Sequence, residues 1–235
     1  MLDGGDFLNS SQSLRQQKEV IGAMNKMGYH AATPGNNELS HGQAHFAALI
    51  PLMHFTMVNC NYEFSGELSN LIKSHLIVYS GEYKIGVTGV GHQLKGIKYN
   101  DAILCANNEA ALLKIKEKCD LIVCLSHLGF SQDGDQPDNQ KLAQQSEYID
   151  IIVSGHNRNL LSGPSILLNK LKKEVIVSHA AWDGLMAGKT TFCYTNGKQK
   201  SAAITKYIVP GRLSGQTLQE TFTGHHEIEK YLITA

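Results

Sequence analysis

Four positions along the chain carry side chains that could bind a metal ion, and each is flanked by glycine within a few residues. They are Asp6, Asn36, His127 and His156. Together they offer one carboxylate, one amide oxygen and two imidazoles, a mixed set that suits Zn²⁺, Mn²⁺, Fe or Co. A lone histidine is more often a surface or hydrogen-bonded residue, and an aspartate beside glycines is often a turn residue. The metal hypothesis therefore depends on the four positions together.

The elements expected to position these side chains are short buried strands. Residues 121–125 form a continuous apolar run, typical of a strand buried on both faces, and residues 149–153 form another. In α/β folds ligands bind at the carboxyl ends of such strands. The adjacent glycines let the backbone turn tightly beside a ligand. The pattern predicts that the four side chains meet at one edge of the fold.

The remaining pattern predicts an α/β domain over 1–209, with 210–235 as a C-terminal extension of unassigned structure. Helices are expected at 13–28, 43–53, 107–118 and 139–147. Strands are expected at 30–33, 55–60, 76–79, 83–90, 121–125, 149–153, 175–177, 190–195 and 202–209, with a hairpin turn at Asn196-Gly197. Met1-Leu2 resembles the end of a strand, which suggests that something upstream is absent.

The composition excludes several classes of protein. Lys+Arg and Asp+Glu both count 21, so the chain lacks the positive charge of a nucleic-acid binder. No apolar run approaches the ~20 residues of a membrane helix. The five cysteines form no CxxC pair, and Cys119, Cys124 and Cys193 are expected to be buried small apolar residues.

Several short motifs together resemble the 5′-nucleotidase branch of the metallophosphoesterases, in the calcineurin-like phosphoesterase superfamily. They are Gly5-Asp6, Met24–Tyr29, Gly35–Glu38, Ser126–Gly129 and Gly155–Arg158, and the similarity covers roughly residues 1–195. The resemblance implies a four-layer αββα sandwich with two metals about 3.5–4 Å apart, which activate a hydroxide and clamp phosphate. It also implies that Asp6, Asn36, His127 and His156 are the ligands of the second metal, with Asp6 shared between the two.

The departures from the family pattern concern catalysis. Asn37 stands where the family has its catalytic histidine, and Ser40 where an aspartate orients that histidine. Arg158 replaces a histidine ligand of the first metal, and a guanidinium cannot coordinate a metal. Two further first-metal ligands belong to a first strand that this chain is expected to lack. His41 is a candidate substitute for the lost histidine.

These departures leave competing hypotheses. The favoured one is a 5′-nucleotidase-like phosphoesterase with a degraded dinuclear site, holding at most one divalent ion and weakly active or inactive. The alternatives are a fully active metal-dependent nucleotidase or phosphatase, and a non-catalytic module that binds a ligand or a partner. Arg158 is either a phosphate or Asp6 contact or a solvated surface residue.

The expected partner is a small phosphorylated ligand or nucleotide, with no nucleic acid and no membrane span. An incomplete sheet would expose unpaired backbone groups, so either residues 210–235 or a partner chain is expected to cover it. The family is often exported, but the first residues show no signal peptide, so the compartment is not predicted.

Overall fold

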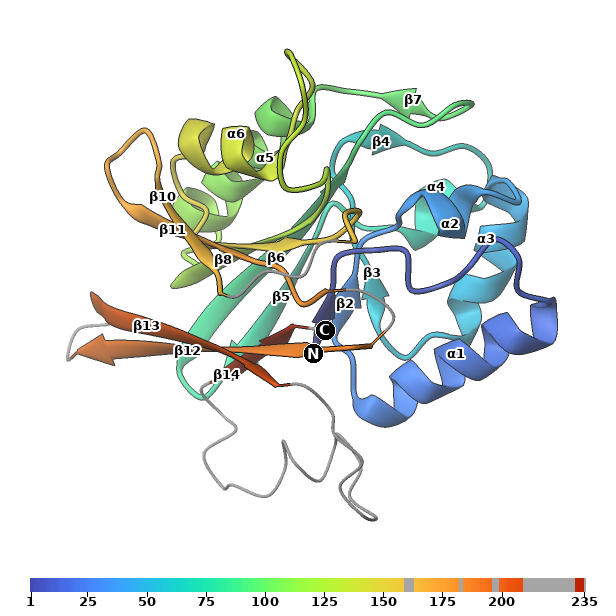
Figure 1. Cartoon of the computed structure of the whole chain (residues 1–235), viewed down its shortest axis with the longest axis horizontal. Helices are drawn as coiled ribbons and strands as arrows, with labels where there is room; N and C mark the ends of the chain where they lie inside the picture. Colours follow the sequence, from blue (N-terminus) through green and yellow to red (C-terminus); the bar gives the residue numbers. More distant parts are fainter. Residues whose placement is uncertain (159–162, 182–183, 196–198, 209–230, 235) are drawn as a thin grey trace.

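The computed structural model describes residues 1–158, 163–181, 184–195, 199–208 and 231–234 as two facing six-stranded sheets (Figure 1). The first sheet has the order β13 (Gln199–Ile208), β12 (Ala187–Thr195), β14 (Tyr231–Thr234), β1 (Leu2–Asp3), β2 (Ala31–Ala32) and β3 (Thr56–Met57). The second has the order β10 (Ser165–Leu168), β11 (Glu174–Ser178), β9 (Ile151–Ser154), β8 (Leu121–His127), β6 (Tyr83–Gly91) and β5 (His75–Ser80). A small separate sheet pairs β4 (Tyr62–Glu63) with β7 (Lys98–Tyr99).

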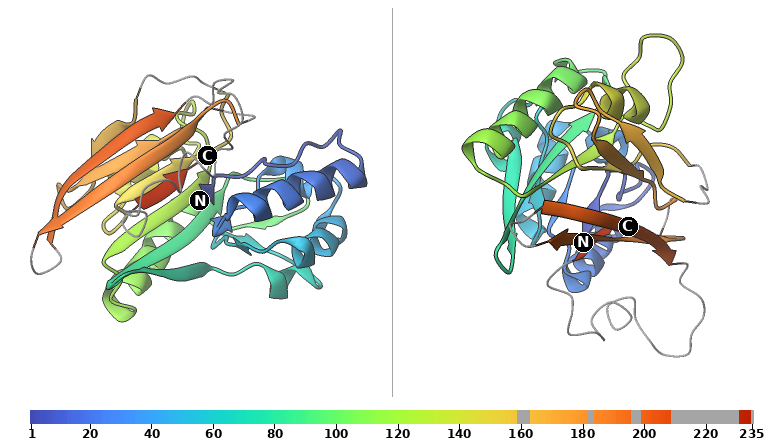
Figure 2. Two further views of the ribbon diagram at one scale, coloured as in Figure 1. Left: turned by 90° about the horizontal axis from the view of Figure 1, so that it is seen from below. Right: turned by 90° about the vertical axis from the view of Figure 1, so that its left-hand side faces the viewer.

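Helices cover the outer side of the second sheet and of the β1–β3 part of the first sheet, as the two turned views in Figure 2 show. On the side of the first sheet lie α1 (Leu14–Met27), α2 (Asn36–Leu39), α3 (Gln43–Leu49) with a 3₁₀ turn η1 (Ile50–Leu52), and α4 (Leu68–Leu71). On the side of the second lie α5 (Ala102–Ala111), its π-helical continuation η2 (Leu112–Lys116), and α6 (Asn139–Gln145). This arrangement confirms the expected α/β sandwich with helices outside two sheets.

Strand β8 shows how sequence alternation builds these layers. Leu121, Val123 and Leu125 pack into the apolar core between the two sheets. Ile122 and Cys124 belong to a second core, between the sheet and helices α5 and α6. Successive side chains of a strand point to opposite faces, so a strand that is covered on both sides is apolar throughout.

Helix α1 ends where its sequence predicts. Ser13 caps the N-terminus by accepting the N–H of Gln16, whose side chain returns to Ser13 in a capping box. Gly28 adopts the left-handed conformation at the C-terminus, with φ 74°. Ile21 and Met24 point into a third core beneath α1, whereas Leu14 is exposed. The first turn is therefore held by its cap rather than by packing.

Other expectations differ from the structure in detail. The helix expected at 107–118 begins at Ala102, because Asp101 caps it and its buried stripe is Ala102, Ala106 and Ala110. Strand β10 and the short helix α2 were not expected, and the turn at Asn196-Gly197 lies outside the described residues, although β12 and β13 do pair antiparallel.

The expected burial of the cysteines holds for two of the three. Cys119 and Cys124 are buried, but the prediction for Cys193 was wrong, because it is exposed. Its strand β12 lies between β13 and β14, and alternate residues of that strand face away from the inter-sheet core.

The C-terminal segment contributes a strand to the first sheet. Strand β14 lies beside β1 in parallel, with Thr234 opposite Leu2, and pairs antiparallel with β12. The edge of β1 that the sequence left without a neighbour is thus covered by the chain itself. Of residues 210–235, only 231–234 are described, and these form β14. No helix in the described part of the chain is both long and apolar enough to cross a membrane.

Candidate metal centre

The four predicted metal-ligand positions come from both sheets and lie together where the sheets meet. Asp6 follows β1, and Asn36 is the first residue of α2, just after β2. His127 is the last residue of β8, and His156 lies two residues beyond β9. The loops cross closely: a Cβ added to Gly155 would lie 2.3 Å from the carbonyl oxygen of Gly4. Glycine at this crossing lets the two strand ends approach each other.

His127 lies at the centre of the group. Its side chain is fully buried, and Nδ1 donates a hydrogen bond to the carbonyl of Gly4 at 2.8 Å. Nε2 lies 3.2 Å from Asn36 Oδ1 and 3.3 Å from Asp6 Oδ2. In metal-binding histidines, one ring nitrogen usually donates to a carbonyl or carboxylate. This hydrogen bond fixes the ring so that the other nitrogen faces the metal.

Glu38 holds the Asp6 and Asn36 loops against each other, and sequence reasoning did not single it out. Its buried carboxylate accepts N–H groups from Leu8, Asp6 and Gly35 at 2.7, 2.9 and 2.8 Å. The backbone N–H of Asn37 donates to Asp6 Oδ1 at 2.8 Å, so that oxygen is also held. Glu38 lies in the first turn of α2, where a carboxylate suits the free N–H groups, but this helix is too short to be indicated by the sequence.

Two of the candidate ligands have unusual backbone conformations. Asp6 has φ 65° and His156 has φ 73°, in the left-handed region that side chains other than glycine rarely adopt. Such conformations cost of order 1–3 kcal/mol and cluster at functional sites. Both residues follow a glycine, so the chain turns sharply at each strand end and presents the side chain to the same region.

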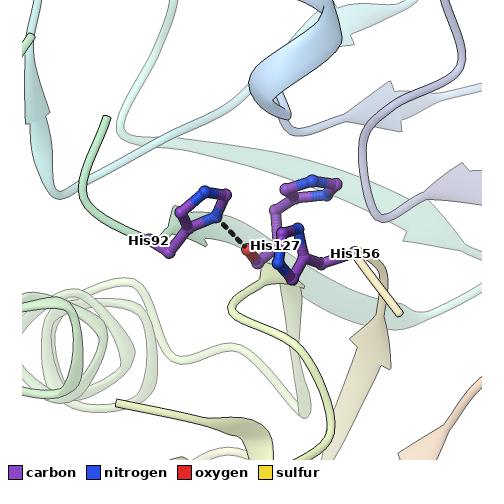
Figure 3. A group of neighbouring side chains, drawn as sticks. All are labelled: His92, His127 and His156. Carbon is purple, nitrogen blue, oxygen red and sulfur yellow. Dashed lines mark hydrogen bonds between the residues drawn. The ribbon is translucent and has the colours of Figure 1, made fainter. Parts of the chain in front are cut away.

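A third histidine, His92, lies beside His127 and His156, and the sequence did not indicate it as a candidate ligand. His92 follows β6, and one ring nitrogen from each of His92, His127 and His156 lies within 4.8 Å of the others (Figure 3). The ring centroids of His92 and His156 are 4.4 Å apart, and those of His127 and His156 are 5.0 Å apart. The available signal was the Gly91-His92 pair at the end of an apolar strand, the same pattern as Gly155-His156.

The electrostatics separate His127 from its two neighbours. Burial works to lower the pKa of His127, but the hydrogen bond and charge of Asp6 outweigh it, so this pKa is raised. Burial also works to raise the pKa of Asp6, yet the contact with His127 leaves it lowered. Burial, then the charge of His127, lowers the pKa of His92, and burial with both neighbouring histidines lowers that of His156 to about 4.

The donor atoms fit a divalent metal ion. Oxygens of Asn36 and Asp6 lie 3.2 and 3.3 Å from Nε2 of His127, and the lowered pKa values of His92 and His156 favour neutral imidazole, the form that binds metals. In the metal-free protein a proton on Nε2 of His127 can bridge to Asp6 and Asn36. A cation would replace that proton and satisfy the same oxygens.

Asn37 lies next to the candidate ligand Asn36, and Ser40 contacts the backbone of Asn37, whereas His41 makes its contact elsewhere. The Asn37 side chain accepts from Asn36 Nδ2 at 3.3 Å, and Ser40 Oγ donates to the carbonyl of Asn37. His41 is exposed, and its Nε2 lies 2.8 Å from the carbonyl of Ser10. This contact engages His41 outside the group, so it gives no support to a substitute role. Arg158 is exposed, two residues after His156.

Two facing sheets with mixed N/O donors at the carboxyl ends of their strands form the arrangement that the resemblance to metal-dependent phosphoesterases implies. The family model described as calcineurin-like phosphoesterase matches residues 1–157, and the chain belongs to this family. It is 25% identical over 178 residues to the snake venom 5′-nucleotidase of Crotalus adamanteus, covering 68% of this chain and 29% of that protein. It is also 25% identical over 229 residues to a 5′-nucleotidase of Vibrio cholerae, covering 84% and 41%.

Solved structures show the same fold. The 5′-nucleotidase precursor of Thermus thermophilus superposes with a TM-score of 0.78 at 22% identity, over 88% of this chain and 44% of that one. The NAD nucleotidase of Haemophilus influenzae gives a TM-score of 0.75 at 22% identity, over 88% and 45%. The chain thus spans less than half the length of these relatives and corresponds to the metallophosphatase domain of 5′-nucleotidase-type proteins.

Proposed function

We propose that this chain is a 5′-nucleotidase-like phosphoesterase domain that binds one divalent metal through Asp6, Asn36, His127 and His156 and hydrolyses phosphoesters weakly or not at all. The observation that carries the metal site is the convergence of Asp6 and Asn36 oxygens on Nε2 of His127 at 3.2–3.3 Å. The bound metal would supply a Lewis acid for a phosphoryl oxygen and a lowered pKa for a bound water.

The chain's own residues support the proposal of weak hydrolysis. The family position for the catalytic histidine carries Asn37, whose amide can hydrogen bond to a phosphoryl oxygen but cannot transfer a proton. Ser40, at the position of the orienting aspartate, donates to the backbone carbonyl of Asn37 rather than to a side chain. General acid–base groups typically contribute about 10²–10⁴-fold to rate, so their loss leaves binding and little turnover.

The ligand is a small phosphorylated molecule, of which a nucleotide is the class suggested by the relatives. His156 and Arg158 are both exposed at the open side of the group, where they can meet such a ligand. The Arg158 guanidinium offers a planar pair of donors that matches a phosphate. By the resemblance, Arg158 stands at the position of a first-metal ligand, so its charge would partly replace that of the metal.

Restoring the two catalytic positions tests this proposal. In the Asn37→His, Ser40→Asp double variant we expect metal-dependent hydrolysis of an aryl phosphate or a 5′-nucleotide to rise at least about tenfold, because a proton-transferring imidazole is regained. The matched control is Ser40→Asp alone, which adds the charge without the imidazole. Robust wild-type turnover that the double variant does not increase would overturn the proposal of an impaired site.

A further inference from the structure

Three neighbouring parallel strands of the second sheet each have a histidine at their carboxyl end or within two residues after it. In β6, β8 and β9 the register places Gly91 opposite His127 and Ser126 opposite Ser154. His92, His127 and His156 therefore leave the sheet at the same edge (Figure 3). We propose that His92 is a third imidazole ligand of the metal bound at this site, an inference that depends on the metal site of the proposed function.

The chemistry of the His92 ring agrees with this role. Its Nδ1 lies 3.0 Å from the carbonyl oxygen of His127, which can only accept a hydrogen bond, so Nδ1 carries the proton. Nε2 then keeps its lone pair for a ligand, the arrangement typical of metal-binding histidines. Bonds of about 2.0–2.1 Å from Zn²⁺ to nitrogen allow two ligand atoms to lie up to about 4 Å apart. One ring nitrogen of each histidine lies within 4.8 Å of the other two, slightly beyond this limit, so sharing one ion requires side-chain movement that brings Nε2 of His92 toward the group.

The backbone around His92 is held more firmly than an ordinary loop. The fully buried Asn61 donates from Nδ2 to the carbonyl of Gly91 and accepts the N–H of Gly91, both at 2.9 Å. The Tyr62 hydroxyl donates to the carbonyl of His92. A Cβ on Gly91 would lie 2.2 Å from that hydroxyl oxygen, so glycine is required for the contact. Two buried polar side chains thus position one half-exposed histidine, as expected for a ligand and its supporting residues.

A third imidazole changes which metal the site prefers. The four predicted ligands offer two nitrogen and two oxygen donors, and His92 adds a third nitrogen. Imidazole suits Zn²⁺, Cu²⁺ and Ni²⁺, whereas carboxylate and carbonyl oxygens suit Mg²⁺ and Mn²⁺. His92 should therefore shift selectivity toward zinc and away from manganese.

Metal affinity, measured without any activity assay, tests the role of His92. Zn²⁺ and Mn²⁺ affinities are obtained by competition with a chromophoric chelator for wild type, His92→Ala, His92→Gln and His127→Ala. The control is His54→Ala, because His54 is exposed and makes its hydrogen bond to Asn25 through its backbone. Losing His92 should lower Zn²⁺ affinity by at least about tenfold. Even the loss of a residue that only supports a metal ligand typically lowers affinity by about 10–100-fold. Mn²⁺ affinity should fall less.

Zinc X-ray absorption gives a second readout, with three imidazoles in the wild type and two in the His92 variants. Thermal melting of the metal-free proteins identifies a variant that fails to fold, and His92→Gln then replaces His92→Ala. Unchanged zinc affinity and imidazole count in the His92 variants, with binding lost in His127→Ala, would overturn the role of His92 while the metal site stands. Absence of zinc and manganese binding in the wild type would overturn the proposed function and this inference together.

Discussion

At the scale of single residues, the site concentrates acidic groups around one histidine. Asp3 and Glu38 both have pKa values raised to about 7, in each case first by burial and then by neighbouring carboxylates against the effect of hydrogen bonds from backbone N–H groups. Asp6 instead has a lowered pKa because His127 contacts it directly. The metal-free site is therefore poor in negative charge below neutral pH and gains it as the pH rises.

The raised pKa of Asp3 predicts how stability depends on pH in the metal-free protein. Its folded value of about 7 exceeds its ordinary value near 4, so between these values the folded state binds more protons than the unfolded state. Stability should fall as pH rises from about 4 to about 7, with a slope of at most about 1.4 kcal/mol per pH unit from this group. Asp3→Asn keeps an acceptor for the N–H of Gly5 and should reduce the slope.

Urea unfolding at several pH values measures this effect. Asp135→Asn is the control, because Asp135 is an exposed residue of an acidic loop. Equal slopes in wild type and Asp3→Asn would show that Asp3 does not titrate differently in the folded protein. Glu38 is unchanged in both proteins, so part of the slope should remain.

At the scale of elements, the site depends on glycines that allow strand ends and loops to approach each other. Gly35 precedes α2, and an added Cβ there would lie 2.3 Å from Asp6 Oδ1 and 2.7 Å from Cε1 of His127. Neither neighbour can withdraw, because Asp6 accepts the N–H of Asn37 and His127 donates to Gly4. A side chain at position 35 must therefore separate the candidate ligands.

We expect Gly35→Ala to lower metal affinity and to destabilise the fold by about 1–3 kcal/mol, the usual range for overpacking. Gly22→Ala is the matched control. Gly22 lies within α1 and its added Cβ would meet nothing within 4 Å, so this change should stabilise the protein by about 0.5–1 kcal/mol. Metal titration and thermal unfolding of the two variants measure both effects. Undiminished metal affinity in Gly35→Ala would contradict the close packing of the site.

The elements that sequence predicted are those with strong local signals. The capping residues Ser13 and Gly28 indicate both ends of α1, and the apolar run 121–125 indicates β8. Helix α2 has only four residues and no periodicity, and the buried stripe of α5 consists of alanines, whose hydrophobic signal is weak. The four candidate ligands could be proposed from the ends of apolar strands. The role of Glu38 and the inclusion of His92 depend on contacts between loops, which sequence pattern does not contain.

At the scale of the whole molecule, the site forms only when the two sheets pack together. Asp6 and Asn36 belong to loops of the first sheet, and His92, His127 and His156 to the ends of strands in the second. The C-terminal strand β14 lies between β12 and β1, beside the strand that leads to Asp6. Packing of the first sheet thus links the last residues of the chain to the position of a candidate ligand.

A variant that ends at residue 230, and so lacks β14, tests this link. Its removal would expose unpaired N–H and C=O groups on β1 and β12, and we expect faster hydrogen exchange in residues 2–6 and a lower melting temperature. Exchange in Leu121–Leu125, in the other sheet, is the internal reference. Exchange in residues 2–6 that stays as slow as in the full chain would contradict a supporting role for β14.

Metal stoichiometry combined with turnover distinguishes a weakly active one-metal domain from a fully active two-metal enzyme. The wild-type chain and His127→Ala are titrated with Zn²⁺, Mn²⁺ and Co²⁺, and each loaded protein is assayed with an aryl phosphate and a 5′-nucleotide. We predict one ion per wild-type chain, loss of that ion in His127→Ala, and little or no hydrolysis, since Asn37 cannot transfer a proton. Two bound ions with robust hydrolysis that His127→Ala abolishes would contradict a one-metal site with little turnover.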